Sequence, residues 1–351
     1  MKLFVNARFL TQPLSGVQRY GIECSRQIKM LLPDTIFLCP NNVIHTYVAK
    51  ELDAKIIGKR TGHKWEQFDL PVFLAGQQSP PLFNPANTAP LFYENNFLTL
   101  HDLAFFHHPE WNSKLFSAWY NFLIPKIVRR SKHIFTVSNF IKEEIERYYH
   151  IPEGKISVTY NGIARQMLEQ APIISKQKII LSVGSFSTRK NHHKLIEAFI
   201  KSGLKDEYQL VIIGDKHKVF KDTNLNEDTI INNNIKIYRR LSDEKLINLY
   251  ISAELLVSLS LYEGFGIPLL EGIYYDCRIL CADIEVYREL FTNYATFCDP
   301  NDANAVGMAL LNAIKDIEKA PDENSMRKTL LLEKLNYREA ARVIVDQVLK
   351  Q

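Results

Sequence analysis

The sequence of 351 residues lacks the features of a membrane-spanning protein. No apolar run approaches the roughly 20 residues that a helix needs to cross a bilayer. The first apolar stretch, which follows Met1 and Lys2, is too short for a secretory signal and is better interpreted as a buried strand. These absences predict a protein of the cytoplasm, and a nucleic-acid partner is not expected.

Cysteine is scarce, and its spacing excludes a disulfide framework or a zinc site. The five cysteines are Cys24, Cys39, Cys277, Cys281 and Cys298. Cys277 and Cys281 are four positions apart, but neither histidine nor a further cysteine lies nearby, which favours core packing over metal binding. Internal repeats and low-complexity tracts are also absent, so a solenoid is excluded.

The charge is unevenly distributed along the chain. Residues 1–165 hold 19 Lys and Arg against 13 Asp and Glu, whereas the remainder holds 24 against 26. One basic group lies at Lys126, Arg129, Arg130 and Lys132, after an aromatic stretch at residues 116–123. Basic and aromatic residues together favour contact with an anionic membrane, and a solvated helix face explains them equally well.

The second half of the chain alternates strands and helices at short intervals. Apolar runs of strand length occur at residues 179–183, 210–213, 235–238, 255–259 and 279–282. Helical spacing follows at residues 195–200, 242–253, 268–275 and 303–317. Buried strands that alternate with helices indicate a parallel sheet covered on both faces, as in doubly wound α/β folds.

The first half shows the same pattern with longer insertions. Strands are expected at residues 3–6, 97–100 and 134–137, and Ser138 is a suitable helix N-cap. A chain of this length exceeds what one core usually supports. We therefore expect two doubly wound domains, at residues 1–165 and 166–335, that face each other across a cleft, with a linker at 164–177. A terminal helix at 336–351 completes the chain.

Two acids, Glu263 and Glu271, bracket a glycine loop that is suited to ligand contact. Gly264 and Gly266 leave the backbone N–H groups open, and Pro268 suits the start of a helix. If the helix starts there, Glu271 lies in its first turn, where it could accept two hydroxyls of a ribose.

Two cations, Arg189 and Lys190, follow the strand that ends near Gly184, and Asn191 could cap the next helix. Fixed cations beside a helix N-terminus stabilise the charge of a leaving diphosphate without a metal. In the first half, Gly16 lies in a loop between a strand and a helix, and His101 and Asp102 follow a strand.

Taken together, these segments resemble the retaining glycosyltransferases of family 4. Residues 85–90, 109–111 and 136–140 fit that family in the same order, and residues 64–67 match a branch that includes mannosyltransferases. The resemblance implies two Rossmann-like domains (the GT-B architecture) and a final helix that returns to the first domain. It implies catalytic roles for His101 and Glu263 and donor binding by Gly16, Arg189, Lys190, Gly264, Phe265, Gly266 and Glu271.

Some positions depart from the family pattern. Ser185 stands where many members have a basic residue, Ala164 replaces an acid, and Arg239 replaces a glycine near the region expected to bind the nucleobase. The Gly-x-Pro expected after the helix of the second acid reads Asp276, Cys277, Arg278. None of these changes removes an expected catalytic group.

The resemblance implies a retaining, metal-independent hexosyltransferase without a cofactor. Its donor would be a nucleotide-diphosphate sugar, with GDP-mannose as the working choice. Its acceptor would be a saccharide or lipid-linked saccharide of cell-surface polysaccharide or lipopolysaccharide synthesis, at the inner face of the cytoplasmic membrane. A non-catalytic sugar-nucleotide-binding subunit and an epimerase or phosphorylase of the same fold are the alternatives.

Overall fold

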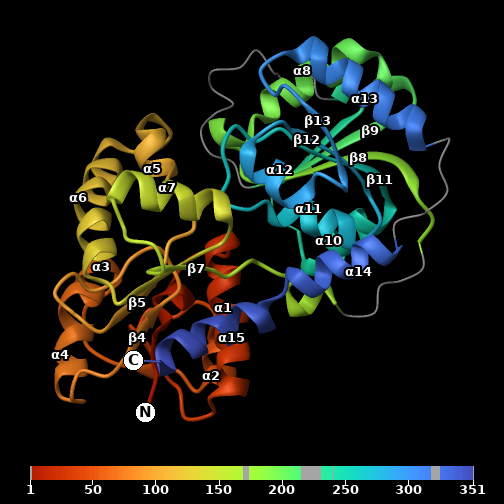
Figure 1. Ribbon diagram of the computed structural model, residues 1–351. Coiled ribbons are helices and arrows are strands. Elements are labelled where there is room, and N and C mark those ends of the chain that lie inside the picture. The colour runs from red at the N-terminus through yellow and green to blue at the C-terminus, as the bar shows by residue number, and fades with distance from the viewer. Residues whose placement is uncertain (1, 169–173, 215–230, 240, 318–324, 351) are drawn as a thin grey trace. The chain divides into compact units, whose positions relative to one another are not determined.

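The computed structural model describes residues 2–168, 174–214, 231–239, 241–317 and 325–350. The chain divides into two compact units, one formed by residues 1–162 with 334–351 and the other by residues 163–333 (Figure 1). These boundaries lie within three residues of those expected after 165 and 335. Among the described residues, no helix is long and apolar enough to cross a membrane.

Unit 1 contains a parallel sheet of seven strands in the order β3-β2-β1-β4-β5-β6-β7. Its strands are β1 (Phe4–Asn6), β2 (Ile36–Cys39), β3 (Lys55–Ile56), β4 (Leu82–Asn84), β5 (Asn96–Thr99), β6 (His133–Thr136) and β7 (Ile156–Val158). Every residue of β1, β4, β5 and β6 is buried, as expected of a parallel sheet covered on both faces. The exposed β3 is short, which limits pairing at this edge.

The helices of unit 1 come from both ends of the chain. They are α1 (Gly16–Leu31), α2 (Thr46–Leu52), α3 (Gly62–Lys64), α4 (Leu70–Ala75), α5 (Ala104–His107), α6 (Lys114–Arg130), α7 (Asn139–Tyr149) and α15 (Tyr337–Leu349). Shorter turns are η1 (Ala7–Thr11), the π-helical η2 (Trp65–Asp69) and η3 (Pro109–Trp111). Helix α7 begins at Ser138, whose hydroxyl accepts from the Ile141 N–H, which confirms the expected cap. The apolar face of α15 packs on α1, so the last helix completes the core of the first unit.

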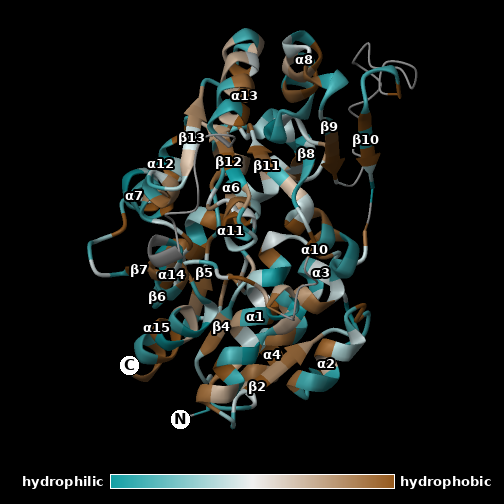
Figure 2. Cartoon of the chain, turned by 90° about the vertical axis from the view of Figure 1, so that its right-hand side faces the viewer, coloured by the Kyte–Doolittle hydropathy of each residue, from teal (hydrophilic) through white to brown (hydrophobic). Residues whose placement is uncertain are grey.

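Unit 2 contains a parallel sheet of six strands in the order β10-β9-β8-β11-β12-β13. Its strands are β8 (Gln177–Val183), β9 (Gln209–Ile213), β10 (Ile235–Tyr238), β11 (Ala253–Ser258), β12 (Arg278–Ala282) and β13 (Ala295–Cys298). Strands β9 and β10 are brown in Figure 2, in line with the apolar runs of the sequence. The α/β class with two Rossmann-like folds is confirmed.

The helices of unit 2 cover its sheet. Those in the described residues are α8 (His192–Ser202), α10 (Asp243–Ser252), α11 (Ile267–Tyr274), α12 (Glu285–Phe291), α13 (Ala303–Ile317) and α14 (Ser325–Lys334), with the short turns η4 (Arg165–Met167), η5 (Thr188–Lys190) and η6 (Leu204–Asp206). One core joins α8 and α13 to the sheet through Phe199, Leu210 and Leu310. All five cysteines are free and buried, as the sequence predicts.

Both sheets reverse their strand order at one point, between β1 and β4 in unit 1 and between β8 and β11 in unit 2. From such a point the loops after the two strands diverge, which leaves room for a ligand beyond the carboxyl ends of the strands. The loops that follow β1, β4, β8 and β11 are therefore the places where binding groups are expected.

Two local expectations need correction. Asn191 does not cap α8 with its side chain, because its backbone is left-handed (φ 56°) and its amide donates instead to the Pro300 carbonyl at 2.7 Å. The described part of the expected linker is also packed: Met167 is buried, and its carbonyl accepts from the Tyr275 hydroxyl at 2.6 Å. This segment therefore belongs to unit 2.

Candidate functional site

The loops after β8 and β11 join directly at the strand-order reversal of unit 2. The Leu261 N–H donates to the Arg189 carbonyl at 2.8 Å, which ties the two loops together through their backbones. At Gly214, which follows β9, an added Cβ would lie only 1.9 Å from the Gly184 carbonyl oxygen. This close approach of backbones requires glycine and fixes the course of the loop after β8.

Glu263 is the centre of this loop junction. Its side chain is 9% exposed, and its carboxylate lies 2.5 Å from Lys190 Nζ and 3.5 Å from the Arg189 guanidinium. Burial alone would raise the pKa of Glu263, but the charges of Arg189 and Lys190, together with hydrogen bonds from Lys190 and Ser260, lower it to about 2. The structure thus brings together three groups that the sequence assigned to the donor, and their net charge is positive.

The turn between Glu263 and α11 has a backbone that only glycine adopts easily. Gly266 has φ 110°, and an added Cβ would lie 2.7 Å from the Tyr287 ring. Gly264 and Phe265 are buried beside it, and the Phe265 ring packs edge-to-face on Phe291 with the centroids 6.3 Å apart. The Phe265 ring therefore anchors the loop.

The expectation that Glu271 occupies the first turn of its helix is wrong. Helix α11 begins at Ile267, so Glu271 is its fifth residue, and no acid lies in the first turn. The helix dipole therefore does not favour this charge in the way expected. The side chain is 4% exposed, and one carboxylate oxygen accepts from the Tyr250 hydroxyl at 2.7 Å. Tyr250 holds the Glu271 side chain through this hydrogen bond, a contact that sequence patterns do not reveal because the two residues are distant along the chain.

His192 is a further residue of this junction that sequence reasoning missed. Its ring lies beneath the loop, with Nε2 3.0 Å from the Gly184 carbonyl. Burial lowers the pKa of His192 to about 4, so the ring is neutral at pH 7 and supports the loop by hydrogen bonding. The feature of the sequence that could have indicated His192 is its position directly after Asn191.

His101 lies just beyond the carboxyl end of β5 in unit 1. Its Nε2 is 2.8 Å from the Pro85 carbonyl, and the Asn87 side chain accepts from its backbone N–H at 2.8 Å. Because a carbonyl only accepts, Nε2 carries the proton and Nδ1 is the acceptor atom of the neutral ring. Burial lowers the pKa of His101, only partly offset by Pro85 and Asp102, which favours that neutral form. Gly16, the other expected residue of this unit, is the exposed first residue of α1.

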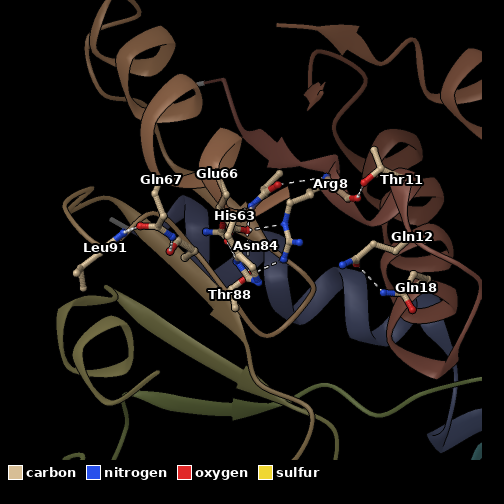
Figure 3. Close-up of polar contacts among 12 residues, drawn as sticks. Arg8, Thr11, Gln12, Gln18, His63, Glu66, Gln67, Asn84, Thr88 and Leu91 are labelled. Carbon is tan, nitrogen blue, oxygen red and sulfur yellow. Dashed lines mark hydrogen bonds and ion pairs between the residues drawn. The ribbon is translucent and has the colours of Figure 1, made fainter. Parts of the chain in front are cut away.

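A buried polar network lies at the strand-order reversal of unit 1 (Figure 3). The Glu66 oxygen Oε1 accepts from Asn6 Nδ2 at 2.9 Å, Arg8 Nε at 3.1 Å and Thr88 Oγ1 at 3.0 Å. Arg8 Nη2 also donates to Thr88 at 2.8 Å, and Asn6 donates to Asn84 at 3.0 Å. These contacts connect the ends of β1 and β4 through their side chains.

Local structure explains why Glu66 points inward. The turn η2 interrupts the helical segment from α3 to α4 with π-helical geometry, a rare local structure that is frequent at functional sites. It directs Trp65 into the core, where the indole N–H donates to Ile57 at 2.8 Å, and Glu66 toward the sheet. Burial would raise the pKa of Glu66, but the charge of Arg8, with His63 and Thr88, lowers it to about 2. Arg8 went unnoticed in the sequence because a lone arginine after a strand carries no signal.

Comparison with known proteins identifies the family. The family model described as "Glycosyl transferases group 1" matches residues 165–328, and the family model described as "Glycosyltransferase Family 4" matches residues 96–166. The chain belongs to glycosyltransferase family 4. The O-antigen chain mannosyltransferase RfbU of Salmonella typhimurium is 32% identical over 67% of this chain and 64% of its own length, so the chain spans just under two thirds of that protein.

Further similarities extend over the whole chain. The O-antigen chain mannosyltransferase B of Escherichia coli is 26% identical over 90% of this chain and 91% of its own length. The crystal structure of Anabaena Alr3699/HepE in complex with UDP-glucose covers all of this chain and 99% of its own, with a TM-score of 0.75 at 13% identity. That structural likeness shows the fold, which is the GT-B architecture of the family.

Proposed function

We propose that this protein is a retaining hexosyltransferase that moves mannose from a nucleotide-diphosphate sugar to a saccharide or lipid-linked saccharide. The observation that carries the proposal is the junction of Arg189, Lys190 and Glu263 at the strand-order reversal of unit 2. The two relatives with the name of O-antigen chain mannosyltransferases support mannose and a cell-surface polysaccharide.

The two cations of the junction are suited to a diphosphate. With Glu263 between them they retain a net positive charge, and their side chains are only 25% and 14% exposed, so that charge is weakly screened. Such preorganised cations stabilise the charge that grows on a leaving phosphate. A metal ion is not needed in this scheme, because the guanidinium and the ammonium supply the countercharge.

The proposed reaction proceeds with retention at the anomeric carbon. The bond between this carbon and the diphosphate oxygen breaks, and its electron pair leaves with the nucleoside diphosphate. The acceptor hydroxyl oxygen forms a bond to the same carbon from the same face, and its proton passes to the leaving phosphate. In this scheme Glu263 and the amides of Gly264 to Gly266 hold the sugar, and Glu271 holds the ribose. His101 accepts a hydroxyl hydrogen bond through Nδ1.

The donor is proposed as GDP-mannose, because relatives are mannosyltransferases, although a solved neighbour of the same fold binds UDP-glucose.

Contact of the basic residues of α6 with an anionic membrane stays a prediction. In Figure 1 this helix lies at the outside of unit 1, and its Lys126, Arg129 and Arg130 are the cations concerned. Cosedimentation with phosphatidylglycerol vesicles, against phosphatidylcholine vesicles, measures such contact.

The proposal is tested by combining nucleotide binding with turnover. Thermal unfolding with GDP, UDP and ADP identifies the base, since a ligand at 100 times its Kd adds about 2.7 kcal/mol of stability. Transfer from the matching nucleotide sugar is then followed with excess chelator present, and the anomeric configuration of the product is read by NMR. We expect retention and full activity in chelator.

A matched pair of variants assigns the activity to the junction. Lys190→Met should reduce kcat/KM by about 100-fold, as removal of one charge-stabilising donor does. Lys194→Met, on the same stretch of chain but paired with Glu197, should match the wild type. Saturable nucleotide binding without transfer to any acceptor would favour the non-catalytic subunit, and conversion of the nucleotide sugar to its epimer would favour an epimerase.

A further inference from the structure

The network of Arg8 and Glu66 is not explained by a purely structural role. Both side chains are nearly fully buried, at 4% and 1% exposure, and a well-packed apolar pair would stabilise the fold at least as well as a buried ion pair. The network also lies beyond the carboxyl ends of β1 and β4, where sheets of this topology place their ligands. These two facts make it a candidate binding site, separate from the donor loops of unit 2.

The network reaches the surface through His63 and Tyr120. His63 lies 3.3 Å from the second carboxylate oxygen of Glu66, and its side chain is 34% exposed. The Tyr120 ring packs edge-to-face on His63, with the ring centroids 6.0 Å apart. Figure 3 shows His63 and Glu66 side by side.

An aromatic surface adjoins these groups on α6. The Trp119 ring is 37% exposed, and its centroid lies 6.2 Å from that of His63 and 6.1 Å from that of Phe122, which stacks on it. Lys126 Nζ covers Phe122 at 3.2 Å from the ring centroid, and Trp119 is the exposed ring that packs edge-to-face on His63. A large ring held by neighbours on two sides offers contact area at little cost in side-chain entropy.

The charges decide what the site prefers. Arg8 is already paired with the Glu66 carboxylate, with Nε 3.1 Å from Oε1, so its positive charge is compensated. The network therefore offers a phosphate no excess of positive charge. Sugar hydroxyls both donate to carboxylates and accept from cationic or phenolic donors, and the apolar face of a pyranose packs on an aromatic ring.

We infer that the Arg8–Glu66–His63 network and the Trp119 ring form a subsite for one uncharged pyranose ring of the acceptor. The inference rests on the proposed function, since it names where the acceptor of that reaction binds. Trp119 is the stacking residue, and Tyr120 and His63 contact the hydroxyls. Glu66 is the positioning residue that holds His63, and Arg8 in turn holds Glu66.

Saturation-transfer NMR on the full chain tests the subsite without donor or turnover. The probes are methyl α-mannopyranoside, methyl β-galactopyranoside and methyl N-acetylglucosaminide. We expect transfer to the ring protons of at least one glycoside, lost in Trp119→Ala and weakened in Tyr120→Phe. It should be kept in Trp119→Phe and in Tyr47→Ala, which alters an exposed aromatic residue on α2. Circular dichroism verifies that each variant is folded.

With an active donor in hand, steady-state kinetics sharpen the same test. Trp119→Ala should raise the KM for the saccharide acceptor about tenfold, which corresponds to about 1.4 kcal/mol, with the donor KM within twofold of wild type. No saturation transfer to any probe, or equal transfer in wild type, Trp119→Ala and Tyr120→Phe, would overturn the subsite. A tryptophan emission shift with phosphatidylglycerol vesicles that Trp119→Ala abolishes, without any glycoside signal, would also overturn it in favour of lipid. A chain that binds glycosides through Trp119 but transfers nothing would refute the proposed function alone.

Discussion

At the scale of single residues, Glu263 has two roles that affect donor binding in opposite ways. It compensates the buried charges of Arg189 and Lys190, and it is the acid proposed to contact the donor sugar. A carboxylate with a pKa of about 2 stays ionised across the physiological range, so it acts as a fixed negative charge rather than as a proton donor.

Replacement of Glu263 by Gln should separate these roles. Without the carboxylate, the two cations are free for the diphosphate, so nucleotide affinity should hold or increase. Transfer should fall by about 100-fold, or about 2.7 kcal/mol in the barrier, because the contact to the sugar is lost. Isothermal titration with the nucleoside diphosphate and kcat at saturating donor measure the two effects. Unchanged transfer would show that Glu263 has no role in the reaction.

Glu66 gives unit 1 a pH-dependent stability. Its pKa in the folded protein is about 2, below the ordinary 4.5, so its contribution is complete above about pH 4.5 and lost as pH falls through 2. Glu66→Gln should therefore be less stable than wild type at pH 7, and the difference should shrink between pH 5 and 2. Urea unfolding at a series of pH values measures this. Glu94→Gln, at an exposed acid of the same unit, should stay parallel to wild type, and a Glu66→Gln deficit that is constant with pH would contradict the assignment.

At the scale of elements, the start of α11 depends on the conformation of one glycine. Gly266→Ala must place a Cβ 2.7 Å from the Tyr287 ring at a φ of 110°, so backbone strain and steric overlap with the ring both destabilise the variant. We expect a loss of about 3 kcal/mol in the free energy of unfolding. Gly203→Ala, with φ 75° but open space around the new Cβ, should lose only about 1 kcal/mol. Denaturant titrations followed by far-UV circular dichroism compare them, and equal losses would mean that the ring contact relaxes without cost.

At the scale of the whole molecule, the two units should unfold in separate transitions, which a comparison of tryptophan fluorescence with far-UV circular dichroism can distinguish. The three tryptophans, Trp65, Trp111 and Trp119, all lie in unit 1, so their fluorescence reports that unit, while far-UV circular dichroism reports both. Ile344 is fully buried on α15, which packs on α1 of the same unit.

Ile344→Ala should lower the free energy of unfolding reported by fluorescence by about 2–5 kcal/mol, although the residue lies at the far end of the chain. Leu256→Ala, in the core of β11, should shift the dichroism transition and leave the fluorescence transition in place. Coincident shifts of both signals in both variants would show that the chain unfolds as one cooperative body.

The sequence by itself determined the class of fold and the positions of most elements. Apolar runs of strand length and helical spacing depend on local periodicity, so residues 303–317 were predicted with the bounds that α13 has, and the terminal helix expected at 336–351 is α15 at Tyr337–Leu349. Arg189, Lys190 and Glu263 could also be predicted from the sequence, because each follows a strand of a parallel sheet and such loops converge.

Only the tertiary structure decided which side chains meet. The partnership of Tyr250 with Glu271, the support from His192 and the network of Arg8 with Glu66 join residues distant along the chain or turned inward by an irregular helix. Their energies come from burial and from neighbouring charge, which no local pattern encodes. The fifth position of Glu271 in α11 has the same origin, because the turn at Gly266 set where that helix begins.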